Sequence, residues 1–318
     1  MRTRTLGHNG PNLTVIGFGA WAIGGGGWEF GWGPQDDEES IATIHRALEL
    51  GVNWIDTAAA YGLGHSEEVV GKAIRSRTRK PYLFTKCSLV WGTDGKINHS
   101  LQRDSVRREC EASLRRLGVD RIDLYQIHWP FPEAQIEEGW ETLARLKEEG
   151  KLRWIGLSNF DVSQLERARK IAPVTSLQPP YSAVHPEVET EILPYCQRHG
   201  IGVIAYSPMQ AGLLTGGVTP DRVAAFPDND WRKRSEDFQE PRLSRNLELQ
   251  RLMARIGASH GQPSAVVALA WVLRSNALTG AIVGARRPEQ VDGFIGAMSF
   301  RLTPDEVEKI AEFLRARP

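Results

Sequence analysis

Short apolar segments alternate with helical segments along the whole chain, and this alternation limits the fold more than any other feature of the sequence. The eight apolar segments, each of strand length, are Val15–Gly19, Trp54–Ile55, Tyr82–Thr85, Leu124–Ile127, Trp154–Leu157, Thr175–Leu177, Val203–Ala205 and Ala281–Val283. The helical segments that follow them are Glu38–Leu50, Glu67–Arg75, Leu101–Leu117, Ala134–Glu149, Ser163–Ile171, Val188–His199, Pro263–Leu273 and Pro288–Ala297. Repeated strand-then-helix units predict an α/β protein with a parallel sheet. Eight units without a break in composition favour a closed (β/α)8 TIM barrel.

Both ends of the chain carry further elements. Arg4–Leu6 and Leu13–Val15 flank the turn sequence Asn9-Gly10, which predicts an N-terminal β-hairpin. A last helix is expected over Pro304–Arg315, because Thr303 can cap it and proline is favoured at a first helical position.

One segment interrupts the alternation. Residues 213–246 are rich in glycine, proline and mixed charge, so we expect a long loop after the seventh strand. Such loops commonly act as lids or binding loops, and in a barrel this loop would emerge at the C-terminal face. The chain shows neither a linker nor a repeat of fixed period, and residues 1–318 are therefore expected to form a single domain.

The charge balance and the cysteines limit the function classes. Lys plus Arg and Asp plus Glu are 39 each, so nothing favours a nucleic acid or an anionic membrane as partner. The three cysteines have no paired spacing, which indicates a reducing compartment. The N-terminal segment lacks the apolar region of a secretory signal, and no apolar run approaches the ~18 residues of a membrane span. We therefore expect a cytoplasmic protein.

One glycine motif suggests a dinucleotide site but does not meet its requirements. Gly17–Ala22 matches G-x-G-x-x-A after a strand, and a Rossmann site requires a helix to begin there. The next residues, Ile23–Trp28, include four consecutive glycines and cannot start one. These glycines are therefore expected to shape a loop. Neither a Walker motif nor a His/Cys cluster with metal-ligand spacing is present, and no metal site is expected.

Polar side chains follow several predicted strands at the point where each ends. Asp56 and Tyr61 follow the second strand, Lys86 the third and His128 the fourth. The later strands are followed by Ser158, Asn159, Gln178, Tyr206 and Ser207. In a barrel these ends meet at one mouth.

This set of side chains suits proton delivery to a carbonyl oxygen. A tyrosine has a pKa of about 10 and is a poor proton donor near neutrality. A lysine ammonium stabilises the phenolate and lowers that pKa, an aspartate holds the lysine, and a neutral histidine orients the carbonyl. No covalent nucleophile is needed.

Five segments resemble the aldo-keto reductase family, and they stand in the family's order. The segments are Asn53–Gly62 with Ser66, Glu67 and Gly71, then Leu124–Pro130, Trp154–Phe160, Tyr206–Pro208 with Gly212–Gly216, and Ile282–Arg286. The likeness runs from Arg4 to about Ala297. It implies an NADPH-dependent enzyme of the bacterial type that reduces aldehydes and ketones by direct hydride transfer, with the cofactor extended across the barrel mouth.

The resemblance also implies a role for individual residues. The catalytic residues would be Asp56, Tyr61, Lys86 and His128, with Tyr61 as general acid. The cofactor-binding residues would be Gly19, Trp21, Asp56, Ser158, Asn159, Gln178, Tyr206, Ser207, Pro208, Gly212, Leu213, Gly284, Arg286 and Gln290. Within this set Tyr206 would stack on the nicotinamide, and Arg286 suits a 2′-phosphate, which favours NADPH over NADH.

The chain departs from the family pattern in the cofactor segments. Gly217 stands where many relatives have lysine, and Gly293-Phe294 stands where relatives often have Glu-Asn. The basic run Arg232–Arg234 is a candidate replacement for the missing phosphate partner.

Three tryptophans on the expected C-terminal loops are candidates for a substrate wall. Trp21, Trp91 and Trp129 would suit carbonyl compounds with aromatic or aliphatic bulk. Ordinary packing is the alternative for each of them. In the same way, Asp56 alone would be read as a cap and Lys86 as a surface lysine, and only their combination indicates catalysis.

Two alternative functions stay open. One is a sugar or polyol dehydrogenase that works in the oxidative direction. The other is a cofactor-sensing binding subunit with slow turnover, like the potassium-channel β subunits of this family. The sequence does not identify the physiological substrate or the oligomeric state.

Overall fold

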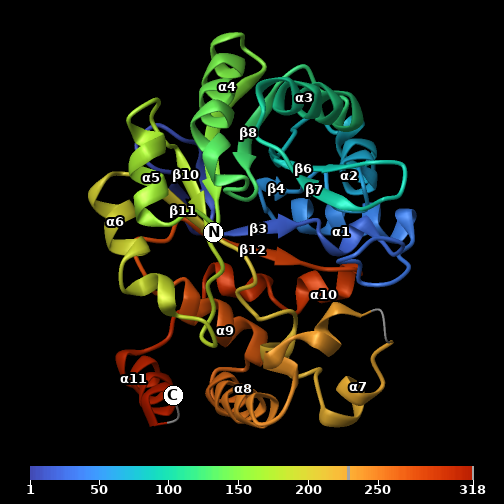
Figure 1. The fold of residues 1–318 in the computed structure, drawn as a ribbon. Helices are drawn as coiled ribbons and strands as arrows, with labels where there is room; N and C mark the ends of the chain where they lie inside the picture. Colours follow the sequence, from blue (N-terminus) through green and yellow to red (C-terminus); the bar gives the residue numbers. More distant parts are fainter. Residues whose placement is uncertain (228–229, 317–318) are drawn as a thin grey trace.

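The computed structural model of the chain describes residues 1–227 and 230–316, and a closed barrel of parallel strands forms its centre (Figure 1). The barrel strands are β3 (Ile16–Gly19), β4 (Trp54–Asp56), β5 (Tyr82–Cys87), β8 (Ile122–Ile127), β9 (Leu152–Ser158), β10 (Ser176–Gln178), β11 (Gly202–Ala205) and β12 (Gly280–Gly284). Each strand pairs in parallel with the next one along the chain, and β12 pairs with β3 to close the barrel. The predicted TIM barrel is confirmed.

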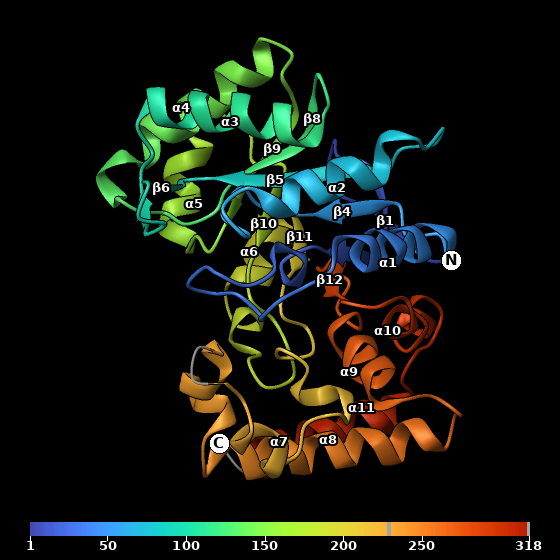
Figure 2. The same cartoon turned by 90° about the vertical axis from the view of Figure 1, so that its right-hand side faces the viewer.

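Helices surround the barrel (Figures 1 and 2). The helices that follow the barrel strands are α1 (Asp37–Glu49), α2 (His65–Arg75), α3 (Arg103–Leu117), α4 (Ile136–Glu148), α5 (Val162–Arg169), α6 (Ile192–Arg198), α9 (Ser264–Val272) and α10 (Pro288–Asp292). Short 3-10 helices are η1 (Ala22–Gly24), η2 (Glu133–Gln135), η3 (Glu187–Glu189) and η7 (Ile295–Met298). Local signals start these helices: Asp161 and Gln164 form a reciprocal capping box at α5. α11 (Pro304–Ala316) begins as predicted, with the Thr303 hydroxyl accepting the Glu306 N–H.

Two hairpins lie outside the barrel. The predicted N-terminal hairpin is present as β1 (Thr3–Thr5) and β2 (Asn12–Thr14). A second hairpin, β6 (Leu89–Trp91) and β7 (Ile97–His99), follows β5 and was not predicted from the sequence. Its strands have three residues each, too short for a clear alternation of apolar and polar side chains.

The segment after β11 is long, as expected, but it is more helical than its composition indicates. It contains η4 (Leu213–Thr215), α7 (Pro220–Ala224), η5 (Trp231–Arg234) and η6 (Glu236–Phe238). α8 (Arg242–Ala258) begins inside the range predicted to be a loop and packs on α9. The glycines and prolines before residue 242 favour a loop, so the sequence analysis did not predict the start of α8. Within residues 1–227 and 230–316, no helix has both the length and the apolar character that a membrane crossing requires.

Strand alternation divides the barrel interior into two layers. Successive side chains of a strand point to opposite faces, so residues two apart share the interior. Trp54, Phe84 and Leu124 belong to an apolar cluster with Leu6 and Leu13 of the N-terminal segment. The residues two positions further along these three strands are polar, and they form the site described next.

Candidate active site

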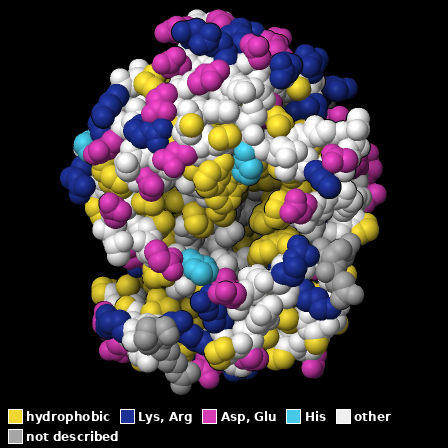
Figure 3. Space-filling view, in the orientation of Figure 1, with side chains coloured by type: hydrophobic (Ala, Val, Ile, Leu, Met, Phe, Trp, Pro, Cys, Tyr) yellow, Lys and Arg dark blue, Asp and Glu magenta, His cyan; other side chains and the backbone are white. Residues whose placement is uncertain are grey.

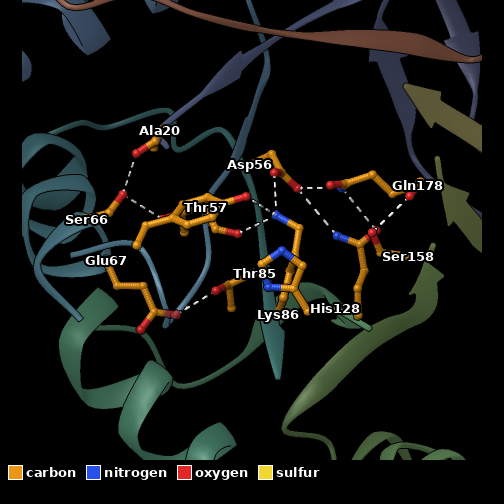
Figure 4. Close-up of polar contacts among 12 residues, drawn as sticks. Ala20, Asp56, Thr57, Ser66, Glu67, Thr85, Lys86, His128, Ser158 and Gln178 are labelled. Carbon is orange, nitrogen blue, oxygen red and sulfur yellow. Dashed lines mark hydrogen bonds and ion pairs between the residues drawn. The ribbon is translucent and has the colours of Figure 1, made fainter. Parts of the chain in front are cut away.

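A buried lysine connects the ends of β4 and β5. The Lys86 Nζ atom donates hydrogen bonds to Asp56 Oδ1 at 2.6 Å and to the Thr57 carbonyl oxygen at 2.9 Å (Figure 4). It also donates to the Tyr61 hydroxyl at 3.2 Å. The side chains of Lys86 and Asp56 are 0% and 3% exposed. The His128 imidazole packs edge-on against the phenol, with ring centroids 5.8 Å apart. The structure therefore brings together all four residues predicted to be catalytic.

Burial and charge determine the protonation states at this site. Burial disfavours the Lys86 ammonium, but the Asp56 carboxylate and the hydrogen bonds to Asp56 and Tyr61 outweigh this effect, and the pKa of Lys86 is raised. Burial raises the pKa of Tyr61 above its ordinary value, against the lowering effect of Lys86. Burial, together with the charge of Lys86, holds the pKa of His128 well below its usual range. The sequence analysis expected Lys86 to lower the pKa of Tyr61; Lys86 acts in that direction, but burial is the larger influence and the net shift is upward.

Two glutamines hold the other oxygen of Asp56. The Gln178 Nε2 atom donates to Asp56 Oδ2 at 2.9 Å and to Gln126 Oε1 at 3.3 Å, and Gln126 Nε2 lies 3.4 Å from the same carboxylate oxygen. The Ser158 hydroxyl donates to the carbonyl oxygen of Gln178 at 2.9 Å (Figure 4). The sequence analysis did not single out Gln126. Gln126 lies two residues after Leu124 on β8, so both side chains point into the barrel, and this spacing could have identified Gln126.

The start of α2 is attached to three strand ends beside the lysine. The Ser66 hydroxyl donates to the Ala20 carbonyl oxygen at 2.8 Å and lies 2.9 Å from the Thr57 hydroxyl. The Thr85 hydroxyl donates to Glu67 Oε1 at 2.6 Å (Figure 4). These contacts explain why a serine and a glutamate follow Tyr61 closely in the sequence: they hold the loop that carries the phenol.

A cavity of about 1010 Å³ extends from Tyr61 and His128 across the barrel mouth. Hydrophobic side chains border a hollow near the middle of the molecule (Figure 3). The predicted cofactor residues that line the cavity are Gly19, Trp21, Asp56, Ser158, Asn159, Gln178, Tyr206, Ser207, Pro208, Gly212, Gly284, Arg286 and Gln290. Leu213 does not line it, because its side chain is fully buried in a separate apolar cluster with Val218 and Phe238.

The backbone after β11 is strained where it borders the cavity. Ser207, Gln210 and Ala211 have φ angles of 54°, 46° and 49°, and Gly212 has 89°. Such conformations are uncommon for residues with side chains, and they cluster at ligand-binding segments. The cavity edge is thus built by an unusual backbone path.

Aromatic rings form one wall of the cavity beside the phenol. Trp21 stacks on Tyr61 with centroids 6.3 Å apart and on Trp231 at 5.4 Å, and the Trp28 ring lies 6.1 Å from Tyr61. Trp129 also lines the cavity. The prediction for Trp91 does not hold: its ring lies outside the cavity lining, with the Arg116 guanidinium 6.0 Å above it.

The sequence analysis missed further hydrophobic residues that line the cavity. Phe30 and Trp32 come from the same glycine-rich loop as Trp28, and Ile97 comes from the unpredicted hairpin. The sequence signal that could have identified them is the aromatic residue at every second position of this loop, at Trp28, Phe30 and Trp32.

The far end of the cavity is lined by arginines. Arg286 donates from Nε to Gln35 Oε1 at 2.6 Å, from Nη1 to the Trp32 carbonyl oxygen at 3.2 Å, and from Nη2 to the Pro34 carbonyl oxygen. Arg232 lines the same cavity, and its guanidinium lies 4.6 Å from the Trp32 ring centroid. Arg286 therefore also ties the loop after β3 to the end of β12.

These residues fit a dinucleotide better than a metal. The cavity is at the upper end of the volumes typical of ligand sites and combines apolar walls with a few polar groups. Cationic side chains at one end suit phosphates, and amide and hydroxyl groups near Tyr61 suit a carboxamide. In residues 1–227 and 230–316, no group of three His, Cys, Asp or Glu side chains could hold a metal ion.

Comparison with known proteins agrees with this geometry. The family model described as the aldo/keto reductase family matches residues 15–315. The chain is 36% identical to the aldo-keto reductase YhdN of Bacillus subtilis, over 99% of this chain and 94% of that protein. It is 34% identical to an NADH-specific methylglyoxal reductase of Escherichia coli, over 99% of both chains.

A solved structure is similar over nearly the whole chain. The glycerol dehydrogenase of Gluconobacter oxydans superposes with a TM-score of 0.90 at 36% identity, covering 99% of this chain and 95% of that one. The protein belongs to the aldo/keto reductase family, whose members are oxidoreductases of carbonyl compounds and alcohols that use nicotinamide cofactors.

Proposed function

We propose that the protein reduces aldehydes and ketones with NADPH and that Tyr61 is the general acid. The observation that carries this proposal is the 3.2 Å contact between the Tyr61 hydroxyl and the Lys86 ammonium at the base of the cavity. A proton donor beside a fixed positive charge suits a carbonyl oxygen that becomes negative during reduction.

Each residue of the site has a distinct part in this reaction. The Tyr61 phenol is protonated near neutral pH, and the adjacent Lys86 ammonium, which lowers its pKa against the raising effect of burial, favours transfer of the proton to the carbonyl oxygen. The Lys86 ammonium stabilises the phenolate that remains, and Asp56 keeps the lysine charged. His128 is neutral and can donate a hydrogen bond that orients the carbonyl. A bound reduced nicotinamide cofactor would supply the hydride.

The cofactor would lie along the cavity from Gln178 and Tyr206 to Arg286. NADPH is proposed over NADH because Arg286, which donates to Gln35 and to two carbonyl oxygens, supplies positive charge at the far end. Arg232 lines the same end but is paired with Asp230, and one relative is named as NADH-specific. We expect Arg286→Ala to remove most of the difference in Kd between NADPH and NADH, measured by quenching of tryptophan fluorescence. Equal binding of both cofactors by the unsubstituted protein would contradict this preference.

Two substitutions test the assignment of the acid. Tyr61→Phe and Lys86→Met should lower NADPH oxidation with a panel of carbonyl compounds by about 10²-fold or more, while the Kd for NADPH changes little. Tyr82→Phe is the matched control, because Tyr82 begins β5 at the opposite end of the barrel from Lys86. Retained turnover in Tyr61→Phe would show that another group donates the proton.

Oxidation of a polyol is a second candidate, favoured by the likeness to a glycerol dehydrogenase. Rates of NADP⁺ reduction with sugars and polyols, set against NADPH oxidation with aldehydes, separate the two directions. A cofactor-sensing subunit would bind NADPH but turn over slowly in both assays. We further propose that residues 1–318 act as one domain in the cytoplasm, as the sequence predicts.

A further inference from the structure

Ser88 has a strained backbone conformation and lies two residues after the proposed catalytic Lys86. It follows the last residue of β5, its side chain is fully buried, and its φ angle is 87°. Residues with side chains rarely adopt this conformation, and it persists only where the surrounding contacts enforce it. The contacts of Ser88 therefore indicate what its conformation is for.

Ser88 links the ends of β5 and β8. Its hydroxyl accepts a hydrogen bond from the Trp129 N–H at 3.1 Å and donates to the Trp129 carbonyl oxygen at 3.2 Å. One residue earlier on each side, the His128 N–H donates to the Cys87 carbonyl oxygen at 2.9 Å. A single hydroxyl thus extends the ladder between these two strands and holds the backbone on the far side of His128.

Glu109 of α3 holds Ser88 from outside the barrel. The Ser88 N–H donates to Glu109 Oε2 at 2.9 Å, and the Ser105 hydroxyl donates to Glu109 Oε1 at 3.3 Å. Glu109 does not line the cavity, so its influence on the reaction would be indirect, and its hydrogen bond to the Ser88 N–H provides a route.

The contacts that run from Glu109 through Ser88 to the Trp129 backbone end at groups that face the reacting centre. The His128 carbonyl oxygen accepts a hydrogen bond from Asn159 Nδ2 at 2.9 Å, and the His128 ring lies against Tyr61. A shift of the Trp129 backbone would therefore move both the imidazole and the amide of Asn159. Catalysis is sensitive to displacements of this kind.

We propose that Glu109 is a positioning residue that fixes His128 through Ser88 and the backbone of Trp129. The inference rests on the proposed function for its kinetic test, whereas its structural test does not require turnover.

The charged surroundings of Glu109 add a pH dependence. Burial raises the pKa of Glu109 to about 7, while the Ser88 N–H, the Ser105 hydroxyl, Arg108 and Arg116 lower it. Cys87 of β5 and Tyr125 of β8 also face it, and their pKa values are raised in part by its charge. A carboxylate accepts an N–H more strongly than a neutral acid does. The positioning effect is thus strongest above pH 7.

The first experiment compares three substitutions on α3. Glu109→Leu should lower kcat/KM for the carbonyl substrate by about 10- to 100-fold and leave the Kd for NADPH nearly unchanged. Glu109→Gln keeps an oxygen acceptor for the Ser88 N–H, so it should recover most of the activity and lose the step in activity near pH 7. The matched control is Glu111→Leu, since Glu111 lies two residues further on the same helix and pairs with Lys151.

A double-mutant cycle tests the path. Ser88→Ala removes the link to Trp129, so it should resemble Glu109→Leu, and the double variant should be little worse than either single variant. Additive losses, an equal loss in Glu111→Leu, or full activity of Glu109→Leu would each overturn the inference.

A structural readout separates this inference from the proposed function. The imidazole NMR signals of His128 should shift in Glu109→Leu and return toward the unsubstituted positions in Glu109→Gln. If the unsubstituted protein reduces no carbonyl compound, the proposed function fails, and the NMR signals alone decide the role of Glu109. Unchanged His128 signals in Glu109→Leu would refute that role.

Discussion

Separating the Lys86–Asp56 pair should destabilise the fold as well as stop the reaction. Both side chains are excluded from water, and the lysine has no second carboxylate among its hydrogen-bond partners Asp56, Thr57 and Tyr61. Removing one partner of a buried ion pair leaves an uncompensated charge, which lowers the free energy of unfolding by about 3–5 kcal/mol. In Asp56→Asn, an amide NH₂ in place of Oδ2 would also face the donor Nε2 atoms of Gln126 and Gln178.

Urea unfolding of four proteins measures this effect. Asp56→Asn and Lys86→Met should each lose about 3–5 kcal/mol relative to the unsubstituted protein. The double variant buries neither charge, so it should lose clearly less than the sum of the two single losses. Single losses below about 1 kcal/mol, the range of exposed ion pairs, would refute the reasoning. Strictly additive losses would do the same.

Three further outcomes are expected at other positions. The hydrogen bond to Asp237 raises the pKa of His185. This pair therefore stabilises the fold below pH ~6.5 and loses that contribution as the pH rises through the raised pKa. Between about pH 6 and pH 9, His185→Ala should lose less stability in thermal unfolding than the unsubstituted protein does. Thr303→Ala removes the cap of α11 and should lower the free energy of unfolding in urea by about 1 kcal/mol, and an unchanged value would show that the cap contributes nothing. Trp231→Ala removes the ring stacked on Trp21 and should raise the Kd for NADPH about 2- to 10-fold by fluorescence titration, whereas an unchanged Kd would separate this aromatic contact from cofactor binding.

The barrel could be predicted because its signals are local. Each strand is a short apolar run, and several of the following helices carry their own start or stop signal, as the Asp161 capping box shows. The positions of the four residues proposed to be catalytic could be predicted for a related reason: each stands at or just after a strand end, and a closed barrel brings all such ends to one face.

The parts that could not be predicted depend on contacts between distant segments. Trp91 is near Lys86 in sequence, but the β6–β7 hairpin places its ring under Arg116, outside the cavity. Arg286 was expected to meet a phosphate, and its three nitrogens also hold the loop at residues 32–35, which lies more than 250 residues away in the chain. Neither arrangement leaves a pattern along the sequence.

The apolar layer below the site explains why a charged pair can persist inside this barrel. Trp54, Phe84 and Leu124 fill the interior one layer beneath Asp56, Lys86 and Gln126, on the same three strands. Leu6 and Leu13 of the N-terminal hairpin segment join this layer, which excludes water from the underside of the pair. An electrostatic contact is stronger where water is excluded, and the same exclusion makes an unpaired charge costly. The hairpin, which lies far from the cavity mouth, therefore supports the charge of Lys86 and, through it, the proposed proton donor Tyr61.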